Sequence, residues 1–196
     1  MRVATICGSH HSESTNAVVI ATIASRLVAG GVTIERIDTS TDLPAFRPEA
    51  VDDPPAGVEA IRAAFCRADG VVFAIPEYAG GLPGWVKNIT DWMVRPAALY
   101  ERPAVVVSAA TMGGALAIQQ LATTLTWQGA YVVATCGLAS PLTMVRNGAI
   151  SDAAVVARLD RIADVLQAVM RGELSAFDAA AATLAPLGID PYVRTT

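Results

Sequence analysis

Residues 70–93 read GVVFAIPEYAGGLPGWVKNITDWM, and this stretch holds one complete strand, loop and helix. Its first part, Gly70–Ile75, is an uninterrupted apolar run that stops at Pro76, which is typical of a buried central strand. Two adjacent glycines then lead into residues 82–93, where the pattern predicts a helix. A buried strand followed by a helix indicates a parallel sheet whose two faces are both covered by helices.

The same strand-and-helix unit recurs four more times along the chain. The other predicted strands are residues 2–7, 32–37, 104–109 and 130–135, and the other predicted helices are residues 14–29, 58–67, 113–127 and 152–170. Residues 39–57 are rich in Pro, Asp and Ser and predict a long loop. Together these units predict an α/β, flavodoxin-like three-layer sandwich around a five-stranded parallel sheet in the order 2-1-3-4-5.

The composition fits a single globular domain. The chain has 196 residues, 53% of them hydrophobic, so it can bury a large core without disulfides or a structural metal. A net charge of −4 and a single lysine, Lys87, argue against a nucleic-acid partner. The sequence shows no apolar stretch long enough for a membrane span and no secretory signal. The three cysteines are far apart, as in proteins of a reducing compartment, so we expect a cytoplasmic location.

The loop after the first predicted strand has the character of a phosphate site. Ligands of open parallel sheets bind beyond the carboxyl ends of the strands, and this loop also opens a helix, whose free N–H groups attract anions. The loop lacks both the Gly-Lys-Ser/Thr ending of a nucleotide loop and the GxGxxG pattern, which favours a monophosphate. Its hydroxyl and amide side chains are Ser9, Ser12, Ser14, Thr15 and Asn16. The alternative is an ordinary helix start at which Ser or Thr caps the first turn.

Two further loops follow the third and fourth predicted strands. Residues 76–84 (PEYAGGLPG) are dense in Pro and Gly, which fixes an irregular backbone that a flat ligand can approach closely. Residues 110–114 (ATMGG) place two glycines at a helix start, where exposed N–H groups can stabilise negative charge. The alternatives are a long connector for the first of these loops and simple helix initiation for the second.

Taken together, the loops resemble those of the NAD(P)H-dependent FMN reductase family. The resemblance covers residues 2–170 and rests on two motifs, G-S-x-R-x-x-S-x-N and P-E-Y-N-G-S-x-P-G-x-x-K-N-x-x-D-W. The matching residues are Gly8, Ser9, Ser14, Asn16, Pro76, Glu77, Tyr78, Gly80, Pro83, Gly84, Lys87, Asn88, Asp91 and Trp92. This chain has His11 in place of the family's Arg, Ala79 in place of its Asn and Gly81 in place of its Ser.

The resemblance implies a bound FMN that passes hydride from NAD(P)H to a small acceptor such as free flavin or a quinone. The residues expected to bind FMN are Ser9, His11, Ser14, Thr15, Asn16, Pro76, Glu77, Tyr78, Ala79, Gly80, Thr111, Met112, Gly113 and Gly114. Because a flavin carries its own chemistry, no catalytic side chain and no metal ligand is expected. Residues 1–172 would form the FMN-binding domain, and residues 173–196 a C-terminal extension that packs on the body or on a partner subunit.

The resemblance also implies a homodimer or homotetramer, with the helix after the second motif contributing to the interface. Two other functions remain open at this point. One is a flavodoxin-type electron carrier without a nicotinamide site, although such carriers are usually more acidic than this chain. The other is a flavin-free regulatory or binding relative, which the departures at His11 and Ala79 would permit.

Overall fold

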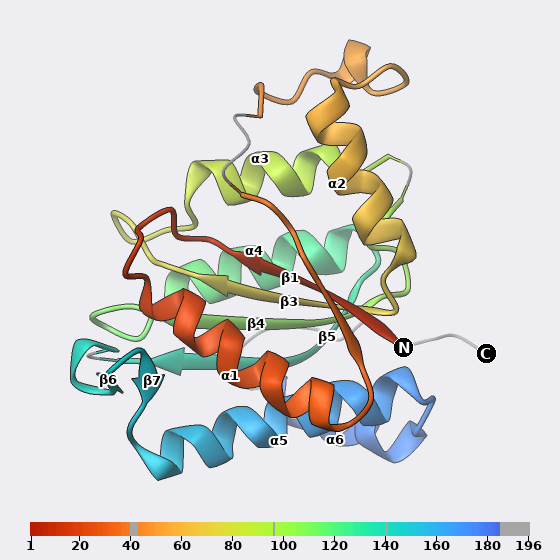
Figure 1. Ribbon diagram of the computed structural model, residues 1–196. Coiled ribbons are helices and arrows are strands. Elements are labelled where there is room, and N and C mark those ends of the chain that lie inside the picture. Colours follow the sequence, from red (N-terminus) through yellow and green to blue (C-terminus); the bar gives the residue numbers. More distant parts are fainter. Residues whose placement is uncertain (40–42, 96, 140, 185–196) are drawn as a thin grey trace.

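Five strands form one parallel sheet in the order β2-β1-β3-β4-β5 (Figure 1). The computed structural model describes residues 1–39, 43–95, 97–139 and 141–184. The strands are β1 Arg2–Cys7, β2 Thr33–Arg36, β3 Gly70–Ile75, β4 Pro103–Ala109 and β5 Tyr131–Leu138. Every neighbouring pair of them is parallel. The predicted flavodoxin-like order is therefore confirmed.

In the part of the chain that the structure describes, six α-helices cover the two faces of the sheet. They are α1 Thr15–Ala29, α2 Ala56–Arg67, α3 Gly84–Trp92, α4 Ala115–Trp127, α5 Ala153–Met170 and α6 Leu174–Leu184. Helices α2, α3 and α4 enclose one core with the sheet, and α1, α5 and α6 enclose the other. The chain thus has the three layers that the sequence predicts.

Strand β3 lies at the centre of the sheet and supplies both cores. Val71, Phe73 and Ile75 point to the α2–α4 side, whereas Val72 and Ala74 point to the α1–α5 side. All five side chains are fully buried. Because full burial of a Val, Ile or Phe side chain stabilises a fold by about 1.5–3 kcal/mol, the uninterrupted apolar run is what this central position requires.

Several predicted boundaries shift by a few residues for local reasons. Helix α4 begins at Ala115 and not at residue 113, because Gly113 and Gly114 have φ angles of 87° and 70°, outside the helical range. Helix α3 begins at Gly84 and not at residue 82, because Pro83 is its N-cap. Strand β5 continues to Leu138 because it pairs with β4 as far as Ala109.

A short antiparallel hairpin, which the sequence analysis missed, follows β5. Its strands are β6 Val145–Arg146 and β7 Ala149–Ile150. The two residues between them, Asn147 and Gly148, both have positive φ, as a type I′ turn requires. The Asn-Gly pair was the signal that could have revealed the hairpin. Two short 3₁₀ helices, Pro48–Ala50 and Pro141–Thr143, complete the described elements.

The described part of the predicted C-terminal extension is helix α6. It packs against α5 and β5, and Ala180 is buried in the core with α1 and α5, whereas Leu184 is buried in the core with α2, α3 and α4. The Phe177 ring meets the Tyr131 ring edge-on at 5.3 Å. The rest of the predicted extension, residues 185–196, lies outside the described residues. Within the described ranges, the structure contains no helix long and apolar enough to cross a membrane.

Candidate functional site

The three loops singled out in the sequence meet at one edge of the sheet. They follow β1, β3 and β4, which are neighbours in the strand order, so their carboxyl ends lie side by side (Figure 1). We call them the first loop (residues 8–14), the second loop (residues 76–83) and the third loop (residues 110–114). The Trp85 indole N–H donates to the Gly8 carbonyl at 3.2 Å and so ties the start of α3 to the first loop.

The N-terminus of α1 carries no side-chain cap. Ser14 is the N-cap residue, with φ −70° and ψ 120°, but its hydroxyl makes no capping hydrogen bond and lies 3.9 Å from the Cys7 sulfur. The first-turn N–H groups of a helix have no partner within the helix itself, and the positive end of its dipole lies there. The alternative in which Ser14 simply caps the helix with its side chain is therefore not what the structure shows.

Two side chains shape the first loop from within. The Ser9 hydroxyl accepts a hydrogen bond from the His11 N–H at 3.4 Å, and His11 Nδ1 accepts one from the Glu13 N–H at 3.1 Å. In this arrangement Nε2 carries the proton of the neutral His11 ring. The neighbouring His10 ring packs against Trp85, with ring centroids 4.6 Å apart. Both histidines are exposed at the edge where a ligand would arrive.

Asn16 joins the first loop to the end of β4. Its side-chain N–H donates to the Ala109 carbonyl at 3.2 Å, and its side-chain oxygen accepts from the Ala109 N–H at 2.9 Å. The residue is only 3% exposed. Its side chain therefore holds two parts of the edge together, a role that the sequence analysis did not foresee.

The second loop contains a tight two-residue turn. Tyr78 and Gly81 exchange both backbone hydrogen bonds, at 3.0 and 3.1 Å, and the residues between them have φ angles of 51° (Ala79) and 71° (Gly80). Both angles are left-handed, a region in which Asn is several times more frequent than most other non-glycine residues. The family's Asn at position 79 suits this turn, and Ala79 occupies it with more strain. The Tyr78 side chain is exposed.

Helix α4 holds the second loop at two points. One oxygen of the Glu77 carboxylate accepts the N–H groups of Leu116 at 3.0 Å and Ala117 at 3.1 Å. The side-chain oxygen of Gln120 accepts the Leu82 N–H at 2.8 Å. The Glu77 side chain is thus engaged by the first turn of α4, while the backbone of its loop remains at the edge of the sheet.

The third loop lies close over the ends of β4 and β5. A side chain on Gly137 would come within 2.4 Å of the Gly113 carbonyl, and one on Gly114 within 1.9 Å of the Ser108 hydroxyl. Thr111 and Met112 project outward, and Met112 is 85% exposed. The glycines therefore allow a close backbone approach that other residues would prevent.

The edge offers groups that fit FMN. The uncapped start of α1 and the hydroxyls of the first loop suit a phosphoryl group, and the glycine-rich second and third loops suit a flat ring.

Burial raises the pKa of the Cys136 thiol in β5, which keeps that thiol protonated and unreactive. Within the described ranges, no three His, Cys, Asp or Glu side chains gather as metal ligands.

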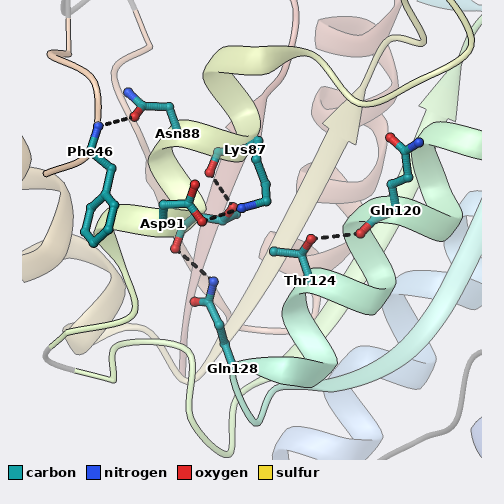
Figure 2. Close-up of polar contacts among 8 residues, drawn as sticks. Phe46, Lys87, Asn88, Asp91, Gln120, Thr124 and Gln128 are labelled. Atoms are coloured by element: carbon teal, nitrogen blue, oxygen red, sulfur yellow. Dashed lines mark hydrogen bonds and ion pairs between the residues drawn. The ribbon is translucent and has the colours of Figure 1, made fainter. Parts of the chain in front are cut away.

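A hollow lies away from this edge, between α3 and α4, and the sequence analysis did not identify it. Its volume is about 830 Å³. Figure 2 shows its polar wall, where Lys87 forms an ion pair with Asp91 on α3 and the Gln128 side-chain N–H donates to the Thr90 carbonyl at 2.9 Å. Val94, Tyr100 and Trp127 beside it are exposed, Trp127 to 87%, whereas Met93 is buried. We call it the α3–α4 groove.

Two motif residues on α3 hold the loop before α2. The Asn88 side chain accepts the Phe46 N–H at 2.7 Å, as Figure 2 shows, and its own N–H donates to the Pro44 carbonyl at 3.0 Å. The Trp92 indole N–H donates to the same carbonyl at 3.0 Å, and Trp92 is 1% exposed. Trp92 is therefore a core residue.

The comparison with solved structures supports the fold class, and the comparison with family profiles identifies the family. The chain is similar in structure to a flavoenzyme NAD(P)H:(acceptor) oxidoreductase from Paracoccus denitrificans, with a TM-score of 0.71 and 23% identity, over 88% of this chain and 98% of that chain. This likeness supports the flavodoxin-like fold. The sequence profile of the family described as NADPH-dependent FMN reductase matches residues 1–143. The chain therefore belongs to that family, and the resemblance inferred from its loops is confirmed.

Curated relatives carry related names. The chain is 31% identical over 97 residues to a quinone reductase from Escherichia coli (strain K12), which covers 48% of this chain and 51% of that protein. It is 40% identical over 121 residues to a probable NADPH:quinone oxidoreductase 2 from Oryza sativa subsp. japonica, covering 58% of each. It is 38% identical over 98 residues to an NAD(P)H-dependent FMN reductase from Pseudomonas aeruginosa, covering 49% of this chain and 51% of that protein. The chain thus spans about half the length of the curated relatives it matches.

Proposed function

We propose that the protein binds FMN and uses it to transfer hydride from NAD(P)H to a small acceptor. The observation that carries the proposal is the α1 N-terminus, which lacks a side-chain cap and begins at the same edge of the sheet as the glycine-rich second and third loops. When bound, FMN supplies the hydride chemistry itself. The protein's part is to hold the phosphate and the ring in place and to leave room for nicotinamide and acceptor.

The phosphate is assigned to the first loop. Ser9, Ser14 and Thr15 would donate from their hydroxyls, His11 from its Nε2–H, and the first turn of α1, including Asn16, from its backbone N–H groups. The charge of a phosphate is favourable at this end of the helix dipole.

The ring is assigned to the second and third loops. The residues that would surround it are Pro76, Glu77, Tyr78, Ala79, Gly80, Thr111, Met112, Gly113 and Gly114. Most of these contacts would come from the backbone, because the Glu77 side chain already binds α4. The exposed Tyr78 and Met112 side chains would lie beside the ring and present apolar surface to an incoming partner.

The acceptor is proposed to be a quinone or a free flavin, because the curated relatives described above are named for these two activities. A cytoplasmic location suits the proposal, since Cys7, Cys66 and Cys136 are all free thiols. Both assignments go beyond the fold and the family.

We also infer assembly into a homodimer or homotetramer through the α3–α4 groove. The exposed side chains of Val94, Tyr100 and Trp127 line this groove together with the Lys87–Asp91 pair. Such an apolar surface with a polar rim is typical of a subunit interface. Replacing Trp127 with Asp should then yield monomers in sedimentation velocity, whereas a wild-type protein that sediments as a monomer would contradict the inference.

One experiment tests the main proposal. Purified protein is mixed with FMN, freed of unbound flavin and titrated with NADPH without oxygen. We expect retained flavin whose visible absorbance bleaches with about one equivalent of NADPH and returns when a quinone is added. Retained flavin that NADPH does not bleach would indicate an electron carrier instead. Protein that never retains flavin would indicate a flavin-free relative.

A further inference from the structure

Helix α4 lacks a side chain at the position where a cap normally sits. Its N-cap residue is Gly114, in a left-handed conformation with φ 70° and ψ 30°. A glycine cannot supply the oxygen that usually accepts the N–H groups of the first turn. Glu77 supplies it from the loop after the neighbouring strand, and its oxygen lies 3.0 Å from the Leu116 nitrogen and 3.1 Å from the Ala117 nitrogen.

This capping bond brings a negative charge to the positive end of the α4 dipole. A carboxylate at that position stabilises a helix and offsets its dipole. A second link between the same two segments, from the Leu82 N–H to Gln120, is neutral. The second loop is therefore attached to α4 by one charged side chain, Glu77, and by one neutral side chain, Gln120.

We propose that Glu77 is a positioning residue of the flavin site, which clamps the second loop to the start of α4 and sets how strongly the site favours reduced over oxidised FMN. The inference rests on the function proposed above. Reduction of FMN adds two electrons and one proton, so the ring gains negative charge near neutral pH. A fixed carboxylate within the loops that enclose the ring disfavours that charge, and it also cancels part of the helix dipole that would stabilise it.

Removing the charge should therefore favour reduced FMN. A charge at a helix terminus contributes about 0.3–1 kcal/mol, which corresponds to about a two- to fivefold change in relative affinity. For a two-electron couple, this change raises the midpoint potential of the bound flavin by about 10 to 20 mV. The matched control is Gln120, whose loss loosens the same loop without altering any charge.

The test compares Glu77→Gln, Glu77→Asp and Gln120→Leu with the wild-type protein, all loaded with FMN. The midpoint potential is measured by spectrophotometric titration against redox dyes, and the affinity for oxidised FMN by fluorescence. We expect the potential to rise in Glu77→Gln and to stay near the wild-type value in Glu77→Asp, which keeps the charge. In Gln120→Leu we expect weaker FMN binding at an unchanged potential.

Hydrogen exchange on the flavin-free proteins gives a second readout. The Leu116 and Ala117 amides should exchange faster in Glu77→Gln than in the wild type, because one weaker acceptor replaces a charged one. An unchanged potential in Glu77→Gln, or an equal rise in Gln120→Leu, overturns the inference and leaves the proposed function intact. A wild-type protein that binds no FMN overturns both.

Discussion

Helices α1 and α4 begin at the same edge of the sheet, but only α4 has a side chain that caps its first turn. At α1 the N-cap residue is Ser14, which has a hydroxyl suited to capping but does not use it. At α4 the N-cap residue is Gly114, which has no side chain that could cap the helix. Instead, the Glu77 carboxylate of the second loop accepts the N–H groups of Leu116 and Ala117 in the first turn of α4. The protein thus satisfies one helix terminus internally and leaves the other available to an anion. The uncapped terminus is the one to which we assign the phosphate in the proposed function.

The largest expected effect on stability comes from a substitution at Gly114, the N-cap residue of α4. Gly114→Ala should lower the free energy of unfolding by about 2–5 kcal/mol, because the new methyl group would meet the Ser108 hydroxyl in a backbone conformation already unfavourable for alanine. The matched control is Gly113→Ala, where the new methyl group would meet Ala139 only at an ordinary contact distance of 4.0 Å, so that the φ of 87° alone opposes the change. We expect a loss of about 1 kcal/mol there. Urea denaturation measures both, and equal losses would contradict this account.

The next effect comes from giving α1 the kind of cap that α4 has. Ser14→Asp places a carboxylate where it can accept the N–H groups of the first turn and repel a phosphate. We expect FMN to bind at least about tenfold more weakly, although the helix itself gains a cap. Ser14→Asn offers a neutral cap of the same size and should weaken binding much less. Fluorescence titration measures both, and unchanged FMN affinity in Ser14→Asp would place the phosphate elsewhere.

A smaller effect should follow from restoring the family's cation in the first loop. His11→Arg adds a permanent positive charge and a fork of donors suited to phosphate. We expect FMN to bind roughly three- to tenfold more tightly at low salt, with the gain shrinking as ionic strength rises. The same titration at two salt concentrations measures this. Equal gains at both concentrations would argue against an electrostatic cause.

The smallest expected effect concerns the turn that brings the second loop to α4. Ala79→Asn should raise the free energy of unfolding by about 0.5–1 kcal/mol, because Asn tolerates the left-handed φ of 51° better than Ala does. Ala79→Val, with a branched side chain at the same φ, should lower it. Chemical denaturation of the apo-proteins separates the two. A loss of stability in Ala79→Asn would mean that the turn is not strained at this residue.

Much of the fold could be predicted because its signals are local. The apolar run of β3 predicts its central place in the sheet from a handful of residues. The end of β5 and the start of α4 were less predictable. Strand β5 is lengthened by pairing with β4, and the glycines before α4 adopt left-handed conformations that a sequence pattern does not distinguish from helical ones.

The candidate site, like the fold, has features that local sequence signals predict and others that depend on contacts between distant segments. The three loops could be located from sequence, because strand order alone brings them to one edge. The roles of Asn16 and Glu77 could not, since Asn16 binds a residue 93 positions away and Glu77 binds residues 39 and 40 positions away. Trp127 belongs to neither motif, so its place in the α3–α4 groove could not be predicted from the sequence. Only the structure shows that it is exposed there.

The sequence by itself determined the alternation of strands and helices, their order in the sheet and the edge where the loops gather. These follow from hydrophobic periodicity and from the fixed hand of strand–helix–strand connections. Only the tertiary structure decided which polar side chains of the loops are bound to other parts of the protein, as Asn16 and Glu77 are. The partners of a hydrogen-bonding side chain are chosen by distances between segments, and sequence spacing does not contain those distances.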